Sequence, residues 1–535
     1  AEQKAEKILK LKKPPLLILD PFGYGSVQSV SDIEIRKVEL SDFLYTKEDG
    51  TTDYVFSIGP CAFANCRNLE SVELPASLYA IYRNAFYGCT ALKSINLENV
   101  GSIGEDAFSQ CKNLRSVVLS KKLESISDGV FASSGLTHID IPKKVAKIGD
   151  RAFAGTCLEK IRIPDSVTEI GKAAFEYCEK LKEISVGAGM ILLDFSIFDF
   201  CYCVEEISIG KNVSLIPDLT YIYNLKNLKK LKVDKDNKTF RIVNNCLIDV
   251  PEKRLIMALK NAVIPSDGSV TTLRTSALVD LSLYKNGELF IPRCIENIGR
   301  AIHKRCGKIT VEEGNKKYRS EGDCLIETAS RKIIMGCGNS VIPADGSVTV
   351  IGSHAFSNVS GAQGEWVDYL EIPSCIEEIE ESAFEHAHIL QYLIYGNGLK
   401  KVGRDAFSGG GKQWLSITDL NNFVQIDFAD RYGASPASDV KVYVNNELLD
   451  TFIINDETPP VNEYAFGDCL SIKKIAVLKF FETEVSLKAF RDCSKIKEIL
   501  VPEGVTVTDI EELPTRLVKK IKYLSYEEIS AKLYE

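Results

Sequence analysis

Residues 139–175 decide the fold; they read IDIPKKVAKIGDRAFAGTCLEKIRIPDSVTEIGKAAF. The stretch contains one pattern twice, with Ile-x-Ile-Pro, then Val, then Ile-Gly and finally Ala-Phe at each pass. The second pass begins at Ile161, 22 residues after Ile139. Self-similarity at a fixed period of this length is the sequence signature of a repeat protein in which successive units stack.

The same spacing extends on both sides through a series of phenylalanines. They recur every 22 or 23 residues, nearly always after Ala, at Phe63, Phe86, Phe108, Phe131, Phe153, Phe175 and Phe198. An apolar residue follows each one at the sixth position, or at the fifth after Phe131 and Phe153, and opens a Leu-x-x-Ile-x-Ile run. Alternate residues of such a run point to one side, which predicts a short β-strand. One strand cannot bury its apolar face alone, so the sequence predicts a solenoid of stacked coils.

These residues carry a resemblance to a known family. The pattern Leu-x-x-Ile-x-Ile-Pro-x-x-Val-x-x-Ile-Gly-x-x-Ala-Phe-x-x-Cys resembles the leucine-rich repeats of the Treponema pallidum type found in BspA-like bacterial surface proteins, over roughly residues 55–510. The resemblance implies a leucine-rich-repeat solenoid, a right-handed superhelix with short parallel β-strands in each coil. Short helical or 3-10 turns would form at Ala-Phe-x-x-Cys, and β-hairpins would be inserted between coils.

The repeat pattern predicts five segments. They are an N-terminal cap at 1–54, regular 22–23-residue repeats at 55–232, degenerate repeats with two hairpin modules at 233–356, further repeats with an inserted hairpin module at 357–510, and a C-terminal cap at 511–535. Caps are expected because an open coil exposes core and strand edges. Glu2–Lys13 predicts a short charged helix, and Ser525-x-x-Glu528 is a capping box that predicts the start of a final helix.

The degenerate segment contains a second, longer repeat. Residues 233–278 match residues 311–356 at an offset of 78 residues, so that Asn237 corresponds to Asn315. In the first copy two apolar runs flank the polar turn Val250–Lys253, which predicts a hairpin inserted into a coil. Such inserts also resemble those of BspA-like proteins.

A different hairpin is predicted near residues 416–454. The run at residues 440–444 meets the run at residues 447–449 across Asn445-Asn446. Asn tolerates the positive φ angles that a two-residue hairpin turn needs. The regular pattern then resumes with Ala-Phe-x-x-Cys at residues 465–469 and 489–493.

Composition and charge exclude several classes of protein. The 535 residues are 45% hydrophobic and 26% charged, as in an ordinary globular protein. Basic residues number 65 against 74 acidic ones, and a net charge of −9 argues against a nucleic-acid partner. No apolar run approaches 18 residues, so no transmembrane segment is predicted. The chain begins at Ala1 without an apolar signal segment, so we expect that a secretion signal has been removed or that the chain was shortened.

The 16 cysteines suggest chemistry, but their positions favour a structural role. Seven of them occupy the third position after a repeat Phe, at Cys66, Cys89, Cys111, Cys178, Cys201, Cys469 and Cys493. Other coils place Ser134, Thr156, Ala387 or Gly410 there, so the position selects a small buried side chain. Cβ atoms of stacked coils point the same way and miss disulfide geometry. We therefore expect buried free thiols.

The remaining candidate sites for metals, phosphates or catalysis are weak. Cys201-x-Cys203 lacks a second pair or a His at zinc spacing, and His386-Ala-His388 flanks a repeat position on an exposed turn. The calcium-like Asp234-x-Asp236 lacks the Gly and Glu that such a loop needs, and Gly409–Lys412 lacks the phosphate-loop pattern. No Ser–His–Asp set or enclosed carboxylate pair can be nominated. The sequence therefore predicts no catalytic residue, no metal site and no cofactor.

The outward residues of the strands remain as a binding surface. In the first half they are polar and mixed in sign, which is also typical of a merely solvated face. In the second half Phe290, Tyr369, Tyr392 and Ile394 are assigned outward positions, and Trp366 follows an unusual loop at residues 360–365. Exposed aromatic side chains are typical binding anchors. The alternative is that the inserted hairpins cover them.

The sequence favours a non-catalytic, secreted or surface-displayed protein that binds other macromolecules, because a long sheet offers area and little enclosed volume. The resemblance implies attachment to host matrix proteins or to other cells. The alternative is a glycan-binding surface protein in nutrient capture. A glycan site needs aromatic side chains beside carboxylates or amides in one groove, for which Trp366 with Asp368 and Trp414 with Gln413 are the hints.

Overall fold

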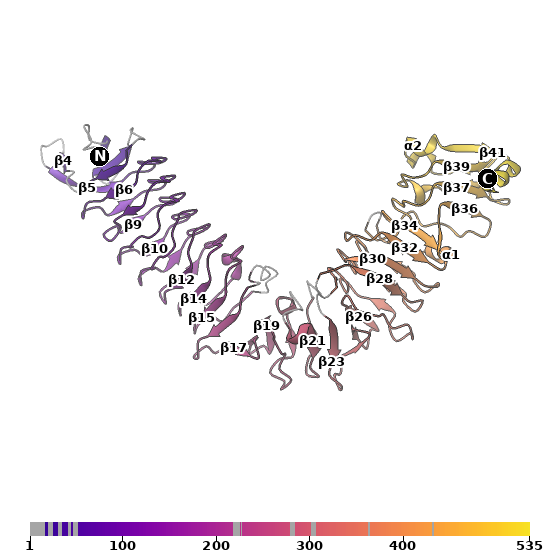
Figure 1. The fold of residues 1–535 in the computed structure, drawn as a ribbon, viewed down its shortest axis with the longest axis horizontal. Coiled ribbons are helices and arrows are strands. Elements are labelled where there is room, and N and C mark those ends of the chain that lie inside the picture. The colour runs from indigo at the N-terminus through magenta and orange to yellow at the C-terminus, as the bar shows by residue number, and fades with distance from the viewer. Residues whose placement is uncertain are drawn as a thin grey trace, which may run out of the picture. The chain divides into compact units, whose positions relative to one another are not determined.

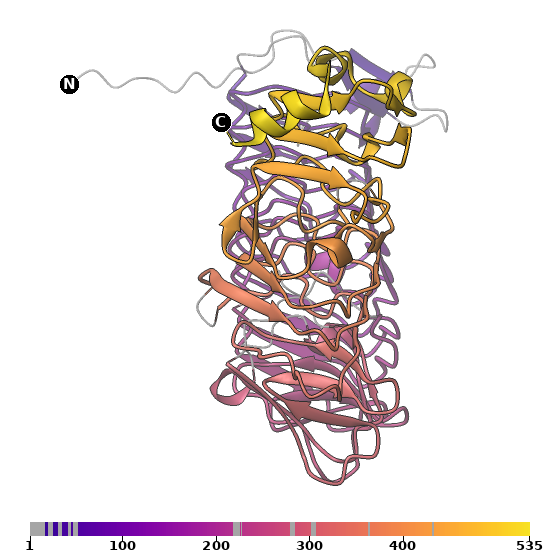
Figure 2. The ribbon, with the colours of Figure 1, turned by 90° about the vertical axis from the view of Figure 1, so that its right-hand side faces the viewer.

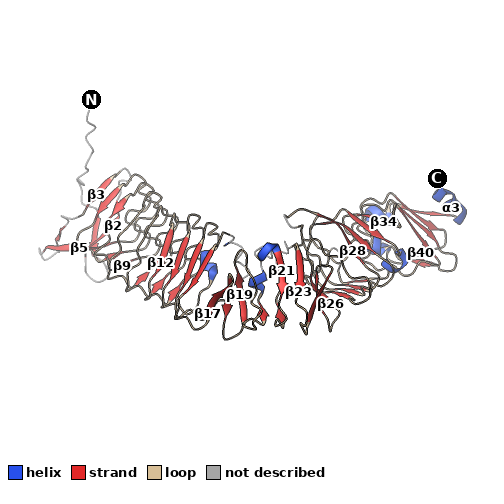
Figure 3. Ribbon diagram, turned by 60° about the horizontal axis from the view of Figure 1, so that its bottom comes forward, coloured by secondary structure: helices blue, strands red, loops and turns tan. Residues whose placement is uncertain are grey.

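The computed structural model describes residues 16–19, 25–29, 35–40, 44–46, 52–217, 225, 227–278, 284–300, 307–361, 364–430 and 433–534. The helix predicted at Glu2–Lys13 lies outside these residues. The chain divides into two compact units, Ala1–Leu259 and Lys260–Glu535, each of which is a stack of coils (Figure 1). Strands predominate in both units and helices are few and short (Figure 3). The predicted β-solenoid is confirmed.

The first unit contains strands that are mostly two to five residues long. They are β1 Leu16–Leu19, β2 Gly25–Ser29, β3 Lys37–Glu39, β4 Leu44–Thr46, β5 Thr52–Ile58, β6 Ser71–Glu73, β7 Ala80–Ile81, β8 Ser94–Ile95, β9 Ser102–Ile103, β10 Ser125–Ile126, β11 Lys147–Ile148, β12 Lys160–Ile163, β13 Glu169–Ile170, β14 Glu183–Val186, β15 Glu206–Ile209, β16 Lys230–Val233, β17 Phe240–Val243, β18 Cys246–Asp249 and β19 Arg254–Ala258. The 3-10 helix η1 spans Phe195–Phe198.

The second unit adds a few short helices to the same kind of coil. Its strands are β20 Thr272–Leu273, β21 Glu288–Ile291, β22 Asn297–Ile298, β23 Lys308–Val311, β24 Tyr318–Glu321, β25 Cys324–Glu327, β26 Lys332–Met335, β27 Val350–Ile351, β28 Val367–Ile372, β29 Glu378–Ile379, β30 Ile389–Ile394, β31 Lys401–Val402, β32 Trp414–Ile417, β33 Asp427–Phe428, β34 Lys441–Val444, β35 Glu447–Leu448, β36 Thr451–Asn455, β37 Lys474–Leu478, β38 Glu484–Val485, β39 Glu498–Pro502, β40 Thr506–Val507 and β41 Ile521–Leu524. Its helices are η3 Thr275–Leu278, η5 Lys285–Gly287, η6 Lys488–Phe490, η7 Ile510–Glu512, α1 Leu420–Phe423, α2 Thr515–Val518 and α3 Tyr526–Tyr534.

A regular coil contributes strands to two different sheets. The Leu-x-x-Ile-x-Ile run forms the longer strand, and β12, β14, β15 and β16 pair in parallel in that order. A second strand of two residues ends at the Ile of each Ile-Gly pair, as in β11 and β13. The Gly that follows lies against the preceding coil: a Cβ on Gly171 would come within 2.5 Å of the Asp150 nitrogen. The repeat therefore needs glycine there for close approach of two backbones.

The repeat phenylalanines stack on one another inside each unit, in an unbroken series in the first. The rings of Phe63 and Phe86 are 5.0 Å apart with an interplanar angle of 5°, and similar contacts continue to Phe198. Phe356, Phe384 and Phe407 repeat the arrangement in the second unit. All of these rings are fully buried. The phenylalanines therefore fill the space between layers, and the Ala-Phe-x-x-Cys segments form the expected short turns, with a 3-10 helix at η1 and η6.

The hairpins predicted for the degenerate repeats are present. β18 pairs antiparallel with β19 across residues 250–253, and β17 pairs antiparallel with β18. The second copy reproduces this arrangement in β24, β25 and β26. Asn315 links the second hairpin module to the preceding coil, because its side-chain amide nitrogen donates hydrogen bonds to the carbonyl oxygens of Pro292 and Ile295. Asn237 makes the equivalent bonds to Gly210 and Val213.

The hairpin predicted across Asn445-Asn446 is also present. β34 pairs antiparallel with β35, and both asparagines have positive φ, 50° and 70°. These are the backbone angles that favour Asn in a two-residue turn. The structure therefore confirms both the hairpin and its turn residues.

A helix ends the described chain and covers part of a sheet. Ser525 and Glu528 form the predicted capping box, in which the Ser525 amide donates to the Glu528 carboxylate at 2.9 Å. Helix α3 then packs on β37 and β39 and buries Ile529 against Ala476 and Leu500. It is the yellow helix beside the C-terminus in Figure 2.

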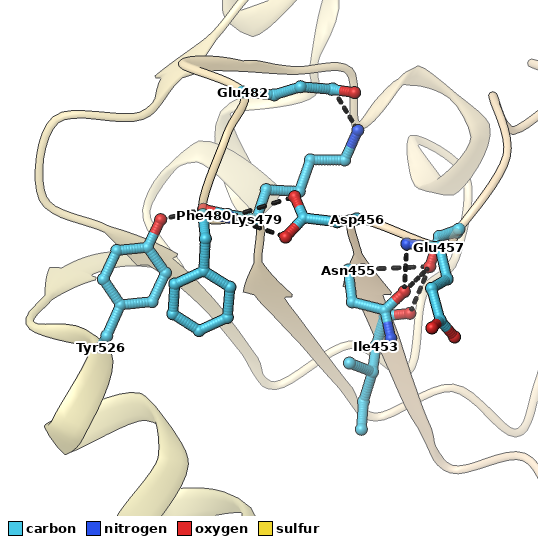
Figure 4. A network of polar contacts seen from close by, with 9 residues as sticks. Ile453, Asn455, Asp456, Glu457, Lys479, Phe480, Glu482 and Tyr526 are labelled. Carbon is cyan, nitrogen blue, oxygen red and sulfur yellow. Dashed lines mark hydrogen bonds and ion pairs between the residues drawn. The ribbon is translucent and has the colours of Figure 1, made fainter.

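The start of α3 is tied to the loop after β37. The ring of Tyr526 stacks on Phe480 at 4.6 Å, and its hydroxyl donates to the Lys479 carbonyl oxygen (Figure 4). The Phe480 amide donates to the Asp456 carboxylate, and Lys479 pairs with Glu482. Asp456, which follows β36, and Tyr526, at the start of α3, thus hold the loop after β37 in place.

Candidate binding surface

The structure corrects two of the five predicted anchors. Tyr392 is 2% exposed and Ile394 4% exposed, so both point into the core and not outward. The first inward residue of β30 is Ile389, five residues after Phe384. Tyr392 and Ile394 lie three and five residues after Ile389 and point inward as well. The Tyr392 ring packs edge-on against Phe384 and Phe407, at 5.3 and 4.9 Å.

The other three predicted anchors are exposed. Phe290 is 44%, Trp366 45% and Tyr369 56% exposed, so the hairpin modules do not cover them. They do not form one group. Phe290 lies on β21, which pairs with β23, whereas Tyr369 lies on β28 in a different sheet. The Trp366 indole stacks on the His388 ring at 4.7 Å.

The outward side of the sheet formed by β28, β30, β32 and β34 carries an aromatic surface. Parallel register aligns Tyr369 with Gln391, Trp414 and Lys441 in one row across the four strands. A second row, two residues further along, aligns Glu371 with Leu393, Ser416 and Tyr443. We call these eight residues the Tyr–Trp face. Trp414 is 36% exposed.

Polar contacts hold part of this face in place. The Gln391 amide donates to the Ser416 hydroxyl at 2.9 Å, which links β30 to β32 on the outward side. Tyr369 and Trp414 are separated by one intervening strand, or about 10 Å at the usual strand spacing. The face therefore presents two large aromatic side chains on a rigid sheet, with the Gln391 amide between them.

A hollow of about 700 Å³ adjoins the face at its edge strand, β28. Tyr369 and Glu371 line it from β28, and Tyr395 lines it from the end of β30. Its other side consists of residues 338–344 and the turn after β24, with Glu321 and Gly322. All of these residues belong to the second unit. The hairpin module thus borders the hollow without covering Tyr369.

The charge of the hollow is negative. Of the residues that the structure describes, Glu321 and Glu371 are the charged ones in the lining, and no Lys, Arg or His is among them. Glu321 is paired with Arg319. Burial, together with the charge and hydrogen bond of Glu371, raises the pKa of Tyr395. The Tyr395 hydroxyl therefore remains protonated and can donate to Glu371 or to a bound ligand.

The cysteines of the repeat position are buried donors. The Cys89 thiol donates to the carbonyl oxygen of Phe63 at 3.1 Å, and the Cys201 thiol to that of Phe175 at 3.1 Å. Thr156, in the same position of another coil, donates to Phe153. Because Ala387 and Gly410, which have no side-chain donor, occupy the same position in other coils, the position selects a small side chain, and several of the cysteines add a hydrogen bond there. The described cysteines are all free thiols.

The structure adds no chemical centre. Within the described part of the chain, no three His, Cys, Asp or Glu side chains are grouped closely enough to hold a metal ion. His386 and His388 are both exposed, and His388 is occupied by its contact with Trp366. Of the helices that the structure describes, none is both long and apolar enough to cross a membrane.

Sequence reasoning missed several residues of this surface. Trp414 was noted only beside Gln413, whereas it lies in register with Tyr369. Tyr395 and Glu371 were not considered. Counting along each strand from its first inward residue would have placed Trp414 outward. The hollow leaves no such signal in the sequence, because its lining comes from four separate segments.

The fold and this surface together define a class, the leucine-rich-repeat solenoids that expose a parallel sheet. The family model for the BspA type leucine-rich-repeat region, present in six copies, matches residues 50–158, 129–248, 327–427 and 440–532. These ranges cover most of the sequence. The chain belongs to the BspA-type leucine-rich-repeat family. No curated protein matches it.

Several solved structures are similar along much of their length. A leucine-rich cell surface protein from Faecalibacterium prausnitzii is 16% identical, covers 90% of this chain and 92% of its own, and has a TM-score of 0.26. The pneumococcal vaccine antigen PcpA is 16% identical, with 95% of both chains covered and a TM-score of 0.28. The leucine-rich-repeat protein of T. pallidum is 25% identical over 40% of this chain and 94% of its own, with a TM-score of 0.26.

Proposed function

We propose that this chain is a non-catalytic, secreted or cell-surface protein that binds other proteins through the Tyr–Trp face and so mediates adhesion to a host matrix or cell-surface protein. The observation that carries the proposal is the in-register row of Tyr369, Gln391 and Trp414 on a rigid sheet. Tyr and Trp are the side chains most enriched among residues that dominate binding energy at protein interfaces. Membership of the BspA-type family supports the same role.

The face has the features of a binding surface and few of those of a catalytic site. It is open and broad, and its two rows mix aromatic, amide and charged side chains. Held on strands, these side chains lose little conformational freedom when a partner binds, which favours affinity. Enzymes instead gather titratable groups in an enclosed pocket.

The test is binding of the full chain to immobilised fibronectin and fibrinogen, compared with a Tyr369→Ala/Trp414→Ala double variant. Removing both rings is expected to weaken binding at least tenfold. Ile453→Ala is the matched control, because Ile453 is an exposed apolar residue on β36, outside the face. Equal binding by the double variant and the parent chain would refute the role of this face. Antibody labelling of intact source cells tests the location.

Glycan binding is the second candidate function, and a separate observation favours it. The hollow beside β28 places two tyrosine rings with Glu371 and Asn339. A glycan site needs such a groove, and neither Trp366 nor Trp414, the candidates from the sequence, lines it. Binding of the chain to a panel of immobilised neutral glycans tests this function. If the chain binds none of them, the function is refuted.

A further inference from the structure

We infer that the hollow beside β28 is a binding site for neutral or amino-substituted saccharides, with Tyr369 and Tyr395 as stacking surfaces and Glu371 as the hydrogen-bond acceptor between them. The inference rests on the second candidate function and assigns it to a site. The site shares Tyr369 and Glu371 with the Tyr–Trp face but does not include Trp414, which does not line the hollow.

The two tyrosines that line the hollow lie at different levels along the strands. Register pairs Ile372 of β28 with Ile394 of β30, so Tyr395 aligns with the residue after Ile372. Tyr369 precedes that residue of β28 by four positions, so the backbones of Tyr369 and Tyr395 are offset by about 13 Å along the strands. Glu371 lies between the two levels on the same outward side. The backbone positions of the two tyrosines are thus spaced for an elongated ligand that contacts both.

The lining matches the chemistry of a sugar. A pyranose has an apolar face of C–H groups, which packs on an aromatic ring, and a rim of hydroxyl donors and acceptors. Tyr369 is 56% exposed, so its ring is open to such packing. The Glu371 carboxylate accepts hydrogen bonds from hydroxyl groups, and Asn339 both donates and accepts. Apolar walls with a few placed polar groups are typical of ligand sites, and about 700 Å³ lies in their usual range.

Charge narrows the class of saccharide. Among the residues that the structure describes, Glu321 and Glu371 are the charged groups of the lining, Glu321 is already paired with Arg319, and no Lys, Arg or His lines the hollow to balance a carboxylate, sulfate or phosphate on the ligand. Placing an unpaired anion beside them is unfavourable. Sialylated, uronic and sulfated glycans are thereby disfavoured, whereas a neutral sugar or a protonated amino sugar is accepted.

The inserted hairpin gives the site its depth. Glu321 and Gly322, at the end of β24, and residues 338–344 border the hollow opposite β28. Gly322 has a φ of 54°, and a Cβ there would meet the Val341 carbonyl oxygen at 2.1 Å. Glycine therefore lets the turn approach residues 338–344, and the Val341 amide donates to the Gly322 carbonyl oxygen. The regular coils of the first unit lack such a module.

The test is fluorescence anisotropy of the full chain with four labelled trisaccharides, namely mannotriose, cellotriose, a glucosamine trimer and a galacturonic acid trimer. At least one of the first three is expected to bind, and the galacturonic acid trimer is expected to bind at least tenfold more weakly. Tyr369→Ala, Tyr395→Ala and Glu371→Gln should each weaken binding about tenfold. Ile453→Ala and Phe290→Ala are the controls and should change it less than twofold, because both residues are exposed and neither lines the hollow.

The possible failures are distinguishable. If no sugar binds, the second candidate function fails and this inference fails with it. If a sugar binds and the three hollow variants leave its affinity unchanged, the function stands and the assignment to this hollow is overturned. Preferred binding of the galacturonic acid trimer would overturn the charge argument. Displacement of the sugar by a Lys-rich extended peptide at lower concentration would reassign the hollow to peptides.

Discussion

The Cys111 thiol donates a hydrogen bond to the carbonyl oxygen of Phe86, 3.2 Å away in the preceding coil. The same relationship joins Cys178 to Phe153. Each thiol thus reaches the coil before it, and the stacked phenylalanines lie alongside. The cysteine position therefore contributes to coil-to-coil cohesion both by its small volume and by its donor.

Substitution of Cys111 should separate these two contributions. Cys111→Ser keeps a donor and a small volume, so it should change stability by less than about 1 kcal/mol. Cys111→Ala removes the donor and leaves a small void, which should cost about 1–2 kcal/mol. Cys111→Leu overpacks a fully buried position and should cost about 1–3 kcal/mol. Urea unfolding measures all three; an alanine variant as stable as the serine variant would contradict a role for the thiol donor.

Buried thiols should also make the fold sensitive to alkaline pH. Burial raises the pKa of Cys111 and that of Cys324 from 9.0 to about 12 each. Between these values the unfolded chain has lost protons that the folded chain retains, so stability falls as pH rises from about 9 to about 12, by up to about 1.4 kcal/mol per unit for each thiol. Below pH 9 these groups contribute no pH dependence.

The measurement is the urea midpoint between pH 7 and pH 11. The Cys111→Ser/Cys324→Ser variant should lose less stability over this range than the parent chain, because both thiols are gone while every other group titrates as before. Parallel curves for the two proteins would contradict the thiol contribution.

The burial of Tyr392 predicts a contrast with Tyr369. Tyr392→Ala removes a ring that packs edge-on against Phe384 and Phe407, and it should cost about 3–5 kcal/mol. Tyr369→Ala removes an exposed ring and should change stability by less than about 0.5 kcal/mol. Thermal unfolding of the two variants measures the contrast. Similar melting temperatures for both would show that Tyr392 is not in the core.

Tyr392 and Tyr369 also show which parts of the structure can be predicted from the sequence. The coil itself is predictable, because the Ala-Phe spacing sets which residues face inward and the facing phenylalanines must then stack. The inward or outward direction of Tyr392 was predicted wrongly because the preceding coil is longer than a regular one. In that coil the first inward residue of β28, Leu370, comes fourteen residues after Phe356, whereas in the regular coils it comes five or six residues after the Phe. Counting afresh from Phe384 gives the correct phase.

The hollow could not be predicted in the same way. Its lining joins the end of β24, residues 338–344 and β28, and a repeat period says nothing about how an inserted hairpin packs against the coils that flank it. The residue types gave no pattern either, since Glu371 and Tyr395 lie 24 positions apart in the sequence. Only the three-dimensional arrangement brings them together.

Asn315 should be essential to its hairpin module. Its amide nitrogen donates to Pro292 and Ile295, and its amide oxygen accepts from the backbone amides of Lys317 and Tyr318 at 2.9 and 2.8 Å. Asn315→Asp replaces the donating group by a carboxylate oxygen that faces two carbonyl oxygens. We expect a loss of about 2–4 kcal/mol, since two donors are lost and like charges meet.

Hydrogen exchange measures this effect locally. Protection should fall in β24 and β25 of the Asn315→Asp variant, while β28 and β30 keep theirs. Asn397→Asp is the control, because Asn397 is exposed and its carbonyl oxygen, not its side chain, accepts from Asn422. Unchanged protection in β24 would contradict the role of the Asn315 side chain.

Helix α3 should be detachable from the sheet that it covers. Ile529 is fully buried against Ala476 and Leu500, and these three residues form the centre of the contact. Ile529→Asp places a charge there, so the helix should lift off and expose residues 525–534 to protease, while the coils remain folded. Ser530→Asp adds the same charge at an exposed position of the same helix and should leave it docked. Limited proteolysis with mass spectrometry distinguishes the two variants; equal cleavage rates would show that the Ile529 contact does not hold the helix.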